Sequence, residues 1–486
     1  MHSSSGTTPR TIGYGWILFA LVLAESASAF ESAMVFVAIP HMMTDFQADV
    51  AAVGWVVTAF YLIAAITAGI CGRLGDLFGR KRLVVVLLLF SAVGSLVSLI
   101  GDNLTMVIIG RGIQGVAGAV MPLVVALARQ TAPPGRANSG IGAVAATAVV
   151  AGSVGYFVAG FLVDAISWHA IFVFSTVLAF AATAVVAFLV PKDERVQAQE
   201  GERIDWLGAG LFAVSVGLIL YGITSANSWG WTSSGVLGLI AAGLVLLAVF
   251  IAVELRTETP LIQVRVFTQR HLALTLFATI AIAGCMGGLG TITSIVMQGP
   301  TSMPLGLGLS ATVAGAISGG SALLAYLTSP ILGRMSSRFG GRSLLLCGSI
   351  MAFANLTAFV LLHDSLPGFL FVQILSSLAT LYLYSSLPIL VAESVPEKRM
   401  GEVTGAQVVL RTAMTSVASA VTSAVLATST VAGTTMPDVT GMQRNILAVA
   451  IWTVPAFLIA FLLRRRQIEE AERPGEPVRT TAEAAT

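Results

Sequence analysis

Two stretches of this chain, far apart in the sequence, share one pattern and decide the fold. The first is GRLGDLFGRKR, from Gly72 to Arg82, and the second is GRMSSRFGGR, from Gly333 to Arg342. Each joins Gly-Arg to a short polar turn and then to Phe-Gly and arginine, and each follows a long apolar run. One such stretch could be an ordinary basic loop. A degenerate copy at the matching place instead indicates an internal duplication into two related sets of helices.

The composition around these stretches is that of a chain surrounded by lipid. Of the 486 residues, 56% are hydrophobic and only 10% are charged, whereas a soluble domain has about 25% charged residues. The formal net charge is only +2, so there is no electrostatic reason to expect a nucleic-acid partner. We therefore expect the lipid bilayer to be the main partner of the chain.

Outward from the repeated stretches, fourteen apolar runs are long enough to cross a bilayer. A spanning helix needs about 20 such residues, and backbone polar groups cannot stay unpaired in lipid, so these runs are expected to be helices. None shows the alternation of a transmembrane barrel. The predicted spans are 14–39, 51–71, 83–101, 104–130, 138–163, 167–190, 206–226, 233–253, 272–297, 309–333, 343–363, 367–392, 402–429 and 445–463.

The distribution of basic residues predicts the orientation of the spans. If the N-terminus is cytoplasmic, only Arg444 of the 26 Lys and Arg residues falls outside, and only Arg111 lies deep in a span. The others fall at the inner side, as the positive-inside rule expects. We therefore predict an even number of spans, cytoplasmic N- and C-termini, and a multi-pass protein of the cell (inner) membrane.

The repeat divides the spans into six, two and six. We predict an N-terminal six-helix bundle over residues 1–190, followed by a cytoplasmic connector and two inserted helices over 191–271. A C-terminal six-helix bundle follows over 272–463, and a disordered cytoplasmic tail over 464–486. The predicted fold class is therefore an all-α membrane protein.

The chain resembles the major facilitator superfamily over most of its length, and within it the fourteen-span drug/proton antiporters. The stretch from Gly72 to Arg82 is similar to the signature loop between the second and third helices of the superfamily. The resemblance implies a major facilitator fold of two six-helix bundles plus two extra helices. The other stretches that carry it are Trp55–Tyr61, Arg111–Gly115, Asp205–Gly208, Trp229–Trp231, Glu254 and Pro260–Leu261.

The resemblance also implies a function. We expect a proton-coupled secondary transporter that exports hydrophobic or amphipathic small molecules, such as drugs and cationic compounds, by alternating access. Protons and the small molecule are then the partners, the proton gradient is the energy source, and no cofactor or metal is expected; we expect a functional monomer. A membrane enzyme or receptor is less favoured, because the sequence has no Walker loop, nucleophile elbow or clustered histidine with a carboxylate.

Within the signature loop, five residues are predicted to form a conformational latch: Gly72, Gly75, Asp76, Gly79 and Arg80. Glycines allow two helix ends to approach closely through a tight turn. The carboxylate of the latch could pair with an arginine or cap a neighbouring helix. Such a contact would hold the two halves together in one conformation and release them in the next.

Three charged residues inside predicted spans are predicted to couple transport to protons. A charge at a span centre costs about 2.5–3.5 kcal/mol on insertion scales, so each needs a partner, water or a function. The resemblance implies a role in proton translocation for Arg111, with structural bracing as the alternative. Glu31, nine residues before Pro40, matches the acidic position in the first helix of the family and is the first carboxylate candidate; Glu25 is the second.

The two glutamates do not share a helix face. Six residues separate Glu25 from Glu31, which at about 100° per residue places them about 240° apart. Glu25 shares a stripe with Ser28 and Ser32, which could line a cavity. A carboxylate in a low dielectric takes up a proton more readily than one in water, which suits loading and unloading. At each glutamate, a packed and hydrogen-bonded side chain is the alternative.

The substrate cavity is predicted from aromatic, amide and thioether side chains inside the spans. Such a wall suits a bulky apolar ligand better than a sugar or a phosphate, although ordinary packing is the alternative at each position. The predicted residues are Gln114, Phe36, Tyr156, Phe157, Met297, Tyr382 and Tyr384.

The fifth span departs from the family pattern. Exporters usually have a Gly-Pro pair and then Gly-Gly, whereas this chain has Tyr156 in place of the proline and Ala159 in place of the first later glycine. The motif is associated with antiport and with a kinked, closely packed helix. Its erosion leaves a proton-coupled importer, or a specialised metabolite carrier on the same fold, as the alternative function.

Overall fold

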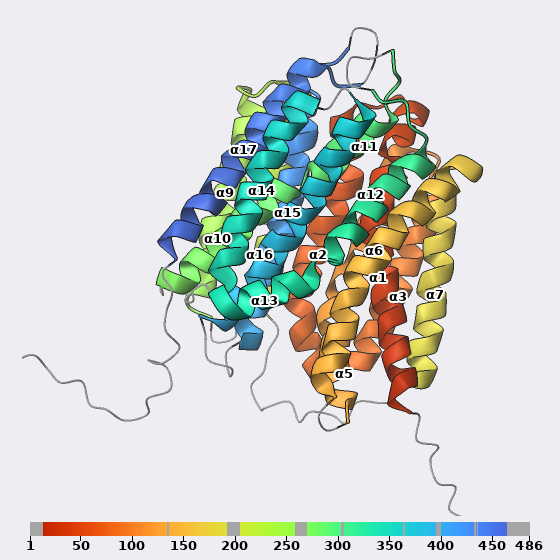
Figure 1. Cartoon of the computed structure of the whole chain (residues 1–486), viewed down its shortest axis with the longest axis vertical. Helices are drawn as coiled ribbons and strands as arrows, with labels where there is room; N and C mark the ends of the chain where they lie inside the picture. Colours follow the sequence, from red (N-terminus) through yellow and green to blue (C-terminus); the bar gives the residue numbers. More distant parts are fainter. Residues whose placement is uncertain are drawn as a thin grey trace, which may run out of the picture.

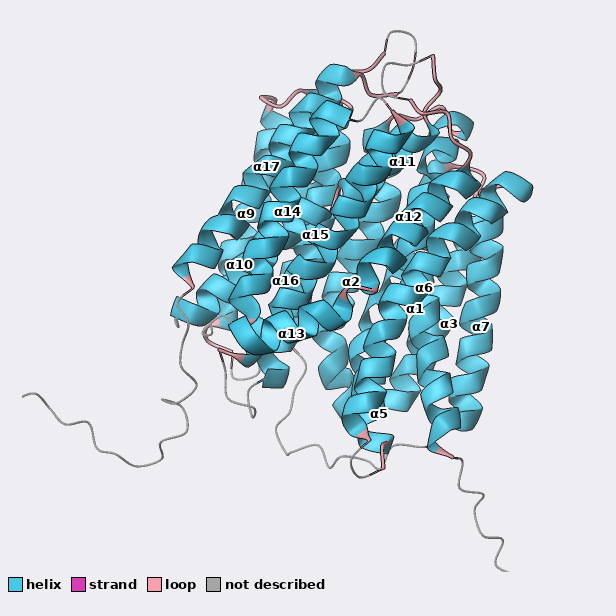
Figure 2. Cartoon of the chain, viewed as in Figure 1, coloured by secondary structure: helices cyan, strands magenta, loops and turns pink. Residues whose placement is uncertain are grey.

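The computed structural model describes residues 13–133, 136–191, 205–257, 270–302, 306–362, 365–394, 400–431, 434 and 436–463. Figure 2 shows that this part of the chain consists of helices joined by short loops, and it contains no strand. The segments 192–204 and 464–486, which hold most of the predicted connector and the predicted tail, lie outside the described residues.

The N-terminal half forms six spans. Side-chain caps start two of its helices, because Asp49 accepts a hydrogen bond from the backbone N–H of Ala52 at 2.8 Å and Asn103 from that of Met106 at 3.0 Å. The helices are α1 (Tyr14–Asp45), α2 (Val50–Phe78), α3 (Arg80–Leu99), α4 (Leu104–Gln114), the 3-10 helix η1 (Gly115–Ala119), α5 (Val120–Thr131), α6 (Ala137–Ala165) and α7 (Ala170–Leu189).

The remaining helices supply the inserted pair and the C-terminal half. In the described part, 13 helices are long and apolar enough to cross a membrane, or 14 if α12 and α13, which meet at 43°, form one broken span. This confirms the predicted fold class. The helices are α8 (Trp206–Trp229), α9 (Ser234–Glu254), α10 (Arg270–Met286), α11 (Leu289–Gln298), α12 (Ala311–Tyr326), α13 (Ser329–Phe339), α14 (Gly341–Leu362), α15 (Leu366–Ala392), α16 (Met400–Leu426) and α17 (Val439–Leu462).

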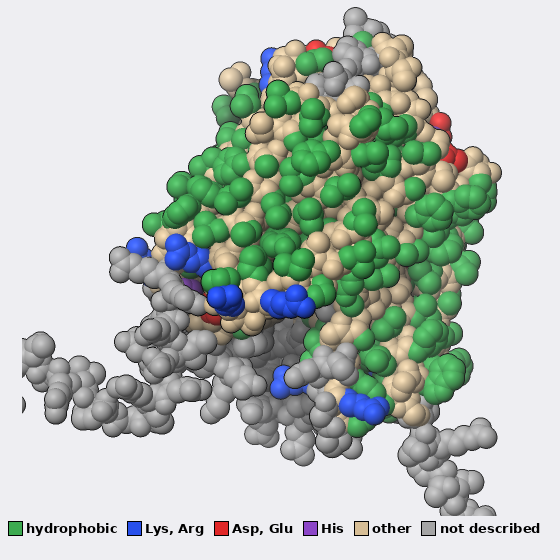
Figure 3. Space-filling view, viewed as in Figure 1, with side chains coloured by type: hydrophobic (Ala, Val, Ile, Leu, Met, Phe, Trp, Pro, Cys, Tyr) green, Lys and Arg blue, Asp and Glu red, His purple; other side chains and the backbone are tan. Residues whose placement is uncertain are grey.

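The two ends of the bundle differ in charge. Helix α1 begins and α17 ends at the same end of the molecule (Figure 1). Figure 3 shows Lys and Arg side chains gathered there, below flanks covered with apolar side chains that would face lipid. We call this the basic end, and the opposite one the distal end. The predicted cytoplasmic location of the basic end remains a prediction.

The two repeated stretches form the same structure. Helix α2 continues to Phe78, and Gly79 alone separates it from α3; in the copy, Gly340 alone separates α13 from α14. Gly79 has φ 93° and Gly340 has φ 76°, in the region that side chains with a Cβ avoid. The predicted tight turn is therefore confirmed at both places, although it is shorter than the loop that the sequence suggested.

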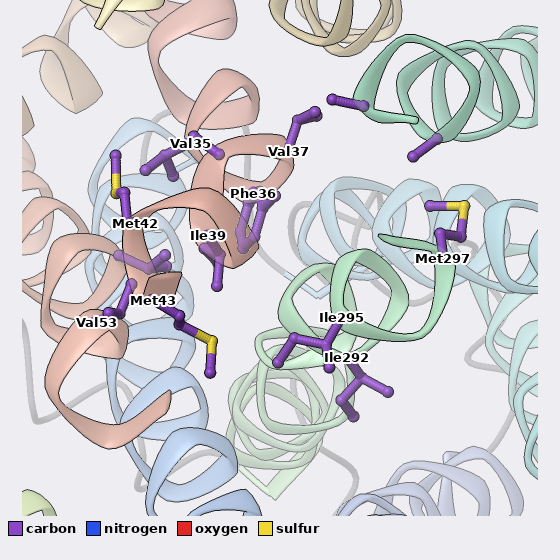
Figure 4. Close-up of a cluster of buried hydrophobic side chains, with 14 of the residues drawn as sticks. Val35, Phe36, Val37, Ile39, Met42, Met43, Val53, Ile292, Ile295 and Met297 are labelled. Atoms are coloured by element: carbon purple, nitrogen blue, oxygen red, sulfur yellow. The ribbon is translucent and has the colours of Figure 1, made fainter. Parts of the chain in front are cut away.

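A hydrophobic core joins the two halves toward the distal end. Figure 4 shows side chains of α1, including Phe36, Ile39 and Met43, facing Ile292 and Ile295 of α11. The core also contains side chains from α2, α12, α15 and α17. Burial of apolar surface contributes about 25 cal/mol per Å², so this shared core favours a conformation in which the halves are closed together at the distal end.

The inserted helices lie over one seam between the halves. Helix α8 packs against both α2 of the N-terminal half and α16 of the C-terminal half. Phe212 and Leu220 of α8 share an apolar cluster with Ala65 of α2 and with Ala406 and Val409 of α16. Helix α8 therefore packs against both bundles.

Candidate functional site

Arg111 lies on α4 and is fully buried inside the N-terminal half. Its Nη1 donates hydrogen bonds to Oε1 of Gln114 at 2.6 Å and to the backbone carbonyl of Glu31 at 2.9 Å. Its Nε donates to the carbonyl of Val56 at 3.2 Å, and the guanidinium lies 4.3 Å from the ring centroid of Phe60. The side chain therefore ties α4 to α1 and α2.

The carboxylate of Glu31 lies in a network of hydroxyl and amide groups. The hydroxyls of Ser91 and Ser175 both donate to its Oε1, the latter at 3.0 Å. The amide Nε2 of Gln114 donates to Ser95 at 2.7 Å and to Ser175 at 3.0 Å. The network therefore joins α1, α3, α4 and α7, and all five of its side chains are buried.

Glu31 and Arg111 are neighbours that do not form a direct ion pair. The guanidinium binds the backbone carbonyl of Glu31, while the carboxylate is held by serine hydroxyls. Within the described part of the chain, Oε2 of Glu31 and Nη2 of Arg111 are buried without a hydrogen-bond partner. Burial disfavours a charged carboxylate, and a nearby positive charge favours it. These two opposing effects meet at the Glu31 carboxylate.

Glu25 lies in a different environment from Glu31, as the predicted angular separation requires. It is only 3% exposed, and its carboxylate interacts electrostatically with Arg411 on α16. The guanidinium of Arg411 lies 5.6 Å from the ring centroid of Tyr384. Ser28 does not join this group, because its hydroxyl donates to a backbone carbonyl of η1 at 2.8 Å. Glu25 thus interacts with the opposite half, whereas Glu31 faces the interior of its own half.

Two of the predicted cavity residues meet at the seam between the halves. The rings of Phe36 on α1 and Tyr156 on α6 are stacked, with centroids 6.4 Å apart and planes at 27°. Phe36 also lies against the backbone of α11, because a Cβ built on Gly290 would be 2.7 Å from its ring. This aromatic pair is therefore in contact with both halves.

The other five predicted cavity residues lie outside this stacked pair. Tyr384 lies beside Arg411. Gln114 belongs to the buried network, and Met297 belongs to the distal core. Tyr382 packs against α13 and α14 inside the C-terminal half. Phe157 is 48% exposed on α6. Of these four, only Met297 shares an apolar cluster with the aromatic pair.

The predicted latch is described only in part. A Cβ on Gly75 would lie 2.8 Å from a methyl group of Leu123 on α5, so the glycine allows close packing there. Arg80 is the first residue of α3. Gly72 and the side chain of Asp76 lie outside what the structure describes at side-chain level. The role of these residues as a latch therefore stays a prediction.

At the distal end, an acidic side chain of one half caps a helix of the other. The carboxylate of Asp164, on α6, accepts hydrogen bonds from the backbone N–H of Ala311 at 3.0 Å and of Thr312 at 2.7 Å. The hydroxyl of Thr312 donates to the carbonyl of Gly160 at 3.3 Å. A carboxylate at a helix N-terminus gains from charge-assisted bonds and from the helix dipole. Asp164 thus fastens α12 to α6.

Helices α6 and α12 pack closely at this seam although the fifth span lacks the usual proline and first later glycine. Helix α6 is unbroken from Ala137 to Ala165, as expected of a span without the proline. A Cβ on Gly315 or Gly319 of α12 would collide with a backbone carbonyl of α6. The glycines that permit the approach therefore lie largely on the partner helix, which the sequence reasoning about α6 did not consider.

The serines that hold Glu31 are not among the residues predicted from the sequence. Ser91 and Ser95 are spaced by one helical turn in an apolar run, and Ser98 follows on the same face. This polar stripe was the available signal. Nothing comparable in the sequence singles out Ser175 or Asp164.

Comparison with known proteins agrees with this architecture. The Major Facilitator Superfamily matches residues 21–305 and 275–485. An uncharacterized MFS-type transporter of Bacillus subtilis, YcnB, is 26% identical over 91% of this chain and 93% of its own length. The tetracenomycin C resistance and export protein of Streptomyces glaucescens is 27% identical, and a multidrug resistance protein B homolog of Mycobacterium tuberculosis is 28% identical. Each of these two matches covers 70% of this chain and 62% of the relative.

Solved structures show the same fold at low identity. A peptide transporter POT in complex with sulfate has a TM-score of 0.65 at 15% identity and covers 92% of this chain and 93% of its own. The POT family transporter PepTSo has a TM-score of 0.63 at 13% identity, with 92% and 96% covered. With the duplicated helix turn and the family match over nearly the whole length, these findings lead to one conclusion: the chain belongs to the major facilitator superfamily.

Proposed function

We propose that this chain is a proton-coupled secondary transporter that exports hydrophobic or amphipathic small molecules, cationic ones among them, by alternating access. In this proposal it works as a monomer in the cell membrane with its basic end in the cytoplasm. The proton gradient supplies the energy, in keeping with a sequence that has no Walker loop.

One observation carries the proton coupling: Glu31 is buried beside Arg111 without a direct ion pair. Buried charges in proteins are normally paired, and intramembrane ionisable groups commonly mark proton or substrate pathways. Because hydroxyl groups hold the carboxylate, a proton can be added or removed without breaking an ion pair. Glu25, which interacts with Arg411 of the other half, is the second candidate.

Export of drug-like molecules rests on two further observations. The named relatives include proteins of antibiotic export and multidrug resistance. The aromatic pair of Phe36 and Tyr156 at the seam offers an apolar contact surface, which suits a hydrophobic ligand.

Everted membrane vesicles test the proposal. Vesicles with an acidified lumen are given ethidium and a panel of neutral hydrophobic antibiotics, and lumenal pH is followed with a fluorescent dye. We expect at least one compound to release lumenal protons through the wild-type protein, and we expect Glu31→Gln to abolish this release. Asp102→Asn, at an exposed loop acid, is the matched control and should behave as wild type.

The outcomes separate the two glutamates. Proton release that survives in Glu31→Gln but disappears in Glu25→Gln would move the coupling site to Glu25. Release that survives in both single variants and in the double variant would contradict a carboxylate-based coupling site on α1.

Uptake is the alternative, because Tyr156 stands where exporters usually have proline. It predicts that whole cells of a host without its own efflux pumps accumulate a compound only when the chain is expressed. Export predicts lower accumulation and a raised inhibitory concentration for the same compounds.

A further inference from the structure

The C-terminal half contains a cavity between α11, α14, α15 and α17, apart from the charged network of the other half. The space open to the centre of a water molecule is about 20 Å³, enough for about one water molecule. Apolar residues form much of its wall. The polar residues that line it are Thr293, Asn355, Gln373, Ser376 and Asn445.

Two buried amides in this cavity lack partners. Asn445 is fully buried and Asn355 is 5% exposed. In the part of the chain that the structure describes, Oδ1 of Asn355 and both Oδ1 and Nδ2 of Asn445 have no hydrogen-bond partner. A buried polar atom without a partner costs about 1–3 kcal/mol, so native proteins normally satisfy such atoms with protein groups or ordered water.

The cavity is the counterpart of the network around Arg111. That network joins the first, third, fourth and sixth spans of its half, and the cavity lies among the same four spans of the other half. The positions along the helices also agree. Gln373 follows the first residue of α15 by as many positions as Arg111 follows the first residue of α4, and Ser376 corresponds to Gln114 in the same way. The duplication has therefore kept a polar site at this place in both halves.

The chemistry of the two sites differs. No residue that lines the cavity carries a charge, so an ion of either sign would lack a counter-charge there. The unpartnered atoms comprise two acceptors and one donor nitrogen. A guest must therefore be neutral, of about the size of water, and able both to donate and to accept hydrogen bonds. Water meets all three conditions, and a buried water typically makes about three hydrogen bonds.

We propose that this cavity is a binding site for one ordered water molecule, which bridges Asn355 on α14 and the amide of Asn445 on α17. The water ties these helices together in the C-terminal half, as Arg111 and Gln114 tie the helices of the N-terminal half. The inference does not depend on the proposed direction of transport or on proton coupling.

A double-mutant cycle tests the bridge. The full-length protein is purified with Asn355→Leu, Asn445→Leu and both changes, and its thermal unfolding is measured. A bridging water couples the two positions, so each single variant should lose about 2 °C or more in melting temperature. The double variant should lose clearly less than the two single losses added together. Thr357→Leu, at an exposed position of α14, is the control and should leave the melting temperature nearly unchanged.

Two results would overturn the proposal. Single variants that melt at higher temperature than wild type, with additive effects, would show a dry cavity with unsatisfied amides. If the proposal is right, an experimental map that resolves ordered waters shows density between Asn355 and Asn445. A map of a transport-substrate complex with a substrate group in that density would assign the site to substrate instead.

Discussion

Arg111 shows how a permanent positive charge is kept inside a helical bundle. Backbone carbonyls of two other helices and one amide oxygen accept its hydrogen bonds, and an aromatic face covers the guanidinium. These partners do not titrate. None of these hydrogen bonds therefore uses the nearby carboxylate of Glu31.

Replacement of Arg111 by lysine should be damaging although the charge is kept. A lysine ammonium cannot reproduce the planar fork that reaches Gln114 and the carbonyls of Glu31 and Val56 at once. Loss of one hydrogen bond to a charged group costs about 1.5–3 kcal/mol. We expect transport by Arg111→Lys in proteoliposomes to fall at least about tenfold, while Arg129→Lys, at an exposed site, keeps it. Near wild-type transport by Arg111→Lys would show that the fork geometry is dispensable.

For individual residues, the sequence could predict the buried charged side chains but not their hydrogen-bond partners. Glu31, Glu25 and Arg111 stand out because charges in apolar runs are rare. Their partners are common residues, such as Ser175, whose contact with Glu31 spans 144 positions of the chain. Such contacts depend on how the helices are rotated against one another, and hydropathy does not specify that rotation.

Among the helices, the one-residue turns at Gly79 and Gly340 are the clearest link between local sequence and duplicated structure. Gly79→Ala forces a Cβ into a backbone conformation with φ 93° and ψ 129°, at a cost of about 1–3 kcal/mol. We expect a lower melting temperature for this variant.

The control for that experiment is Gly142→Ala in α6, where nothing lies within 4 Å of an added Cβ. Alanine favours a helix over glycine by about 1 kcal/mol, so this variant should melt at the same or a higher temperature. Equal losses in both variants would argue against strain at the turn.

The helix breaks are the part of the helical structure that sequence reasoning did not predict. The span over 309–333 bends by 43° between α12 and α13, where Pro330 occupies the first turn of α13. The span over 104–130 tightens into η1. Hydropathy continues through both places, so a search for apolar runs counts each as one span. A break depends on a few backbone hydrogen bonds that such a search does not see.

For the molecule as a whole, the distal contact of Asp164 should bias the conformational equilibrium. The carboxylate bridges the halves only while α6 and α12 are close. Asp164→Ala removes two charge-assisted hydrogen bonds and should raise the population that is open at the distal end. Spin labels placed at the distal ends of α6 and α12 should show longer distances in this variant, with Asp102→Asn as control. Unchanged distances would show that the apolar core alone closes this end.

The overall architecture was predictable because two independent signals agreed. The spacing of apolar runs gave fourteen spans, and the duplicated stretch separated them into six, two and six. The candidate site was predictable only as a set of charged residues on α1 and α4. The division of the predicted cavity residues among a buried network, a distal core and a seam depends on tertiary packing.

The inserted helices have a consequence for molecules dissolved in the bilayer. A bundle of two similar halves has two seams along which lipid could meet both, and here α8 covers the one between α2 and α16. The other seam, between α6 and α12, has no such cover from the inserted pair. The inserted pair therefore leaves the seam on the side of Tyr156 in direct contact with the surrounding lipid, whereas the opposite seam is shielded from it.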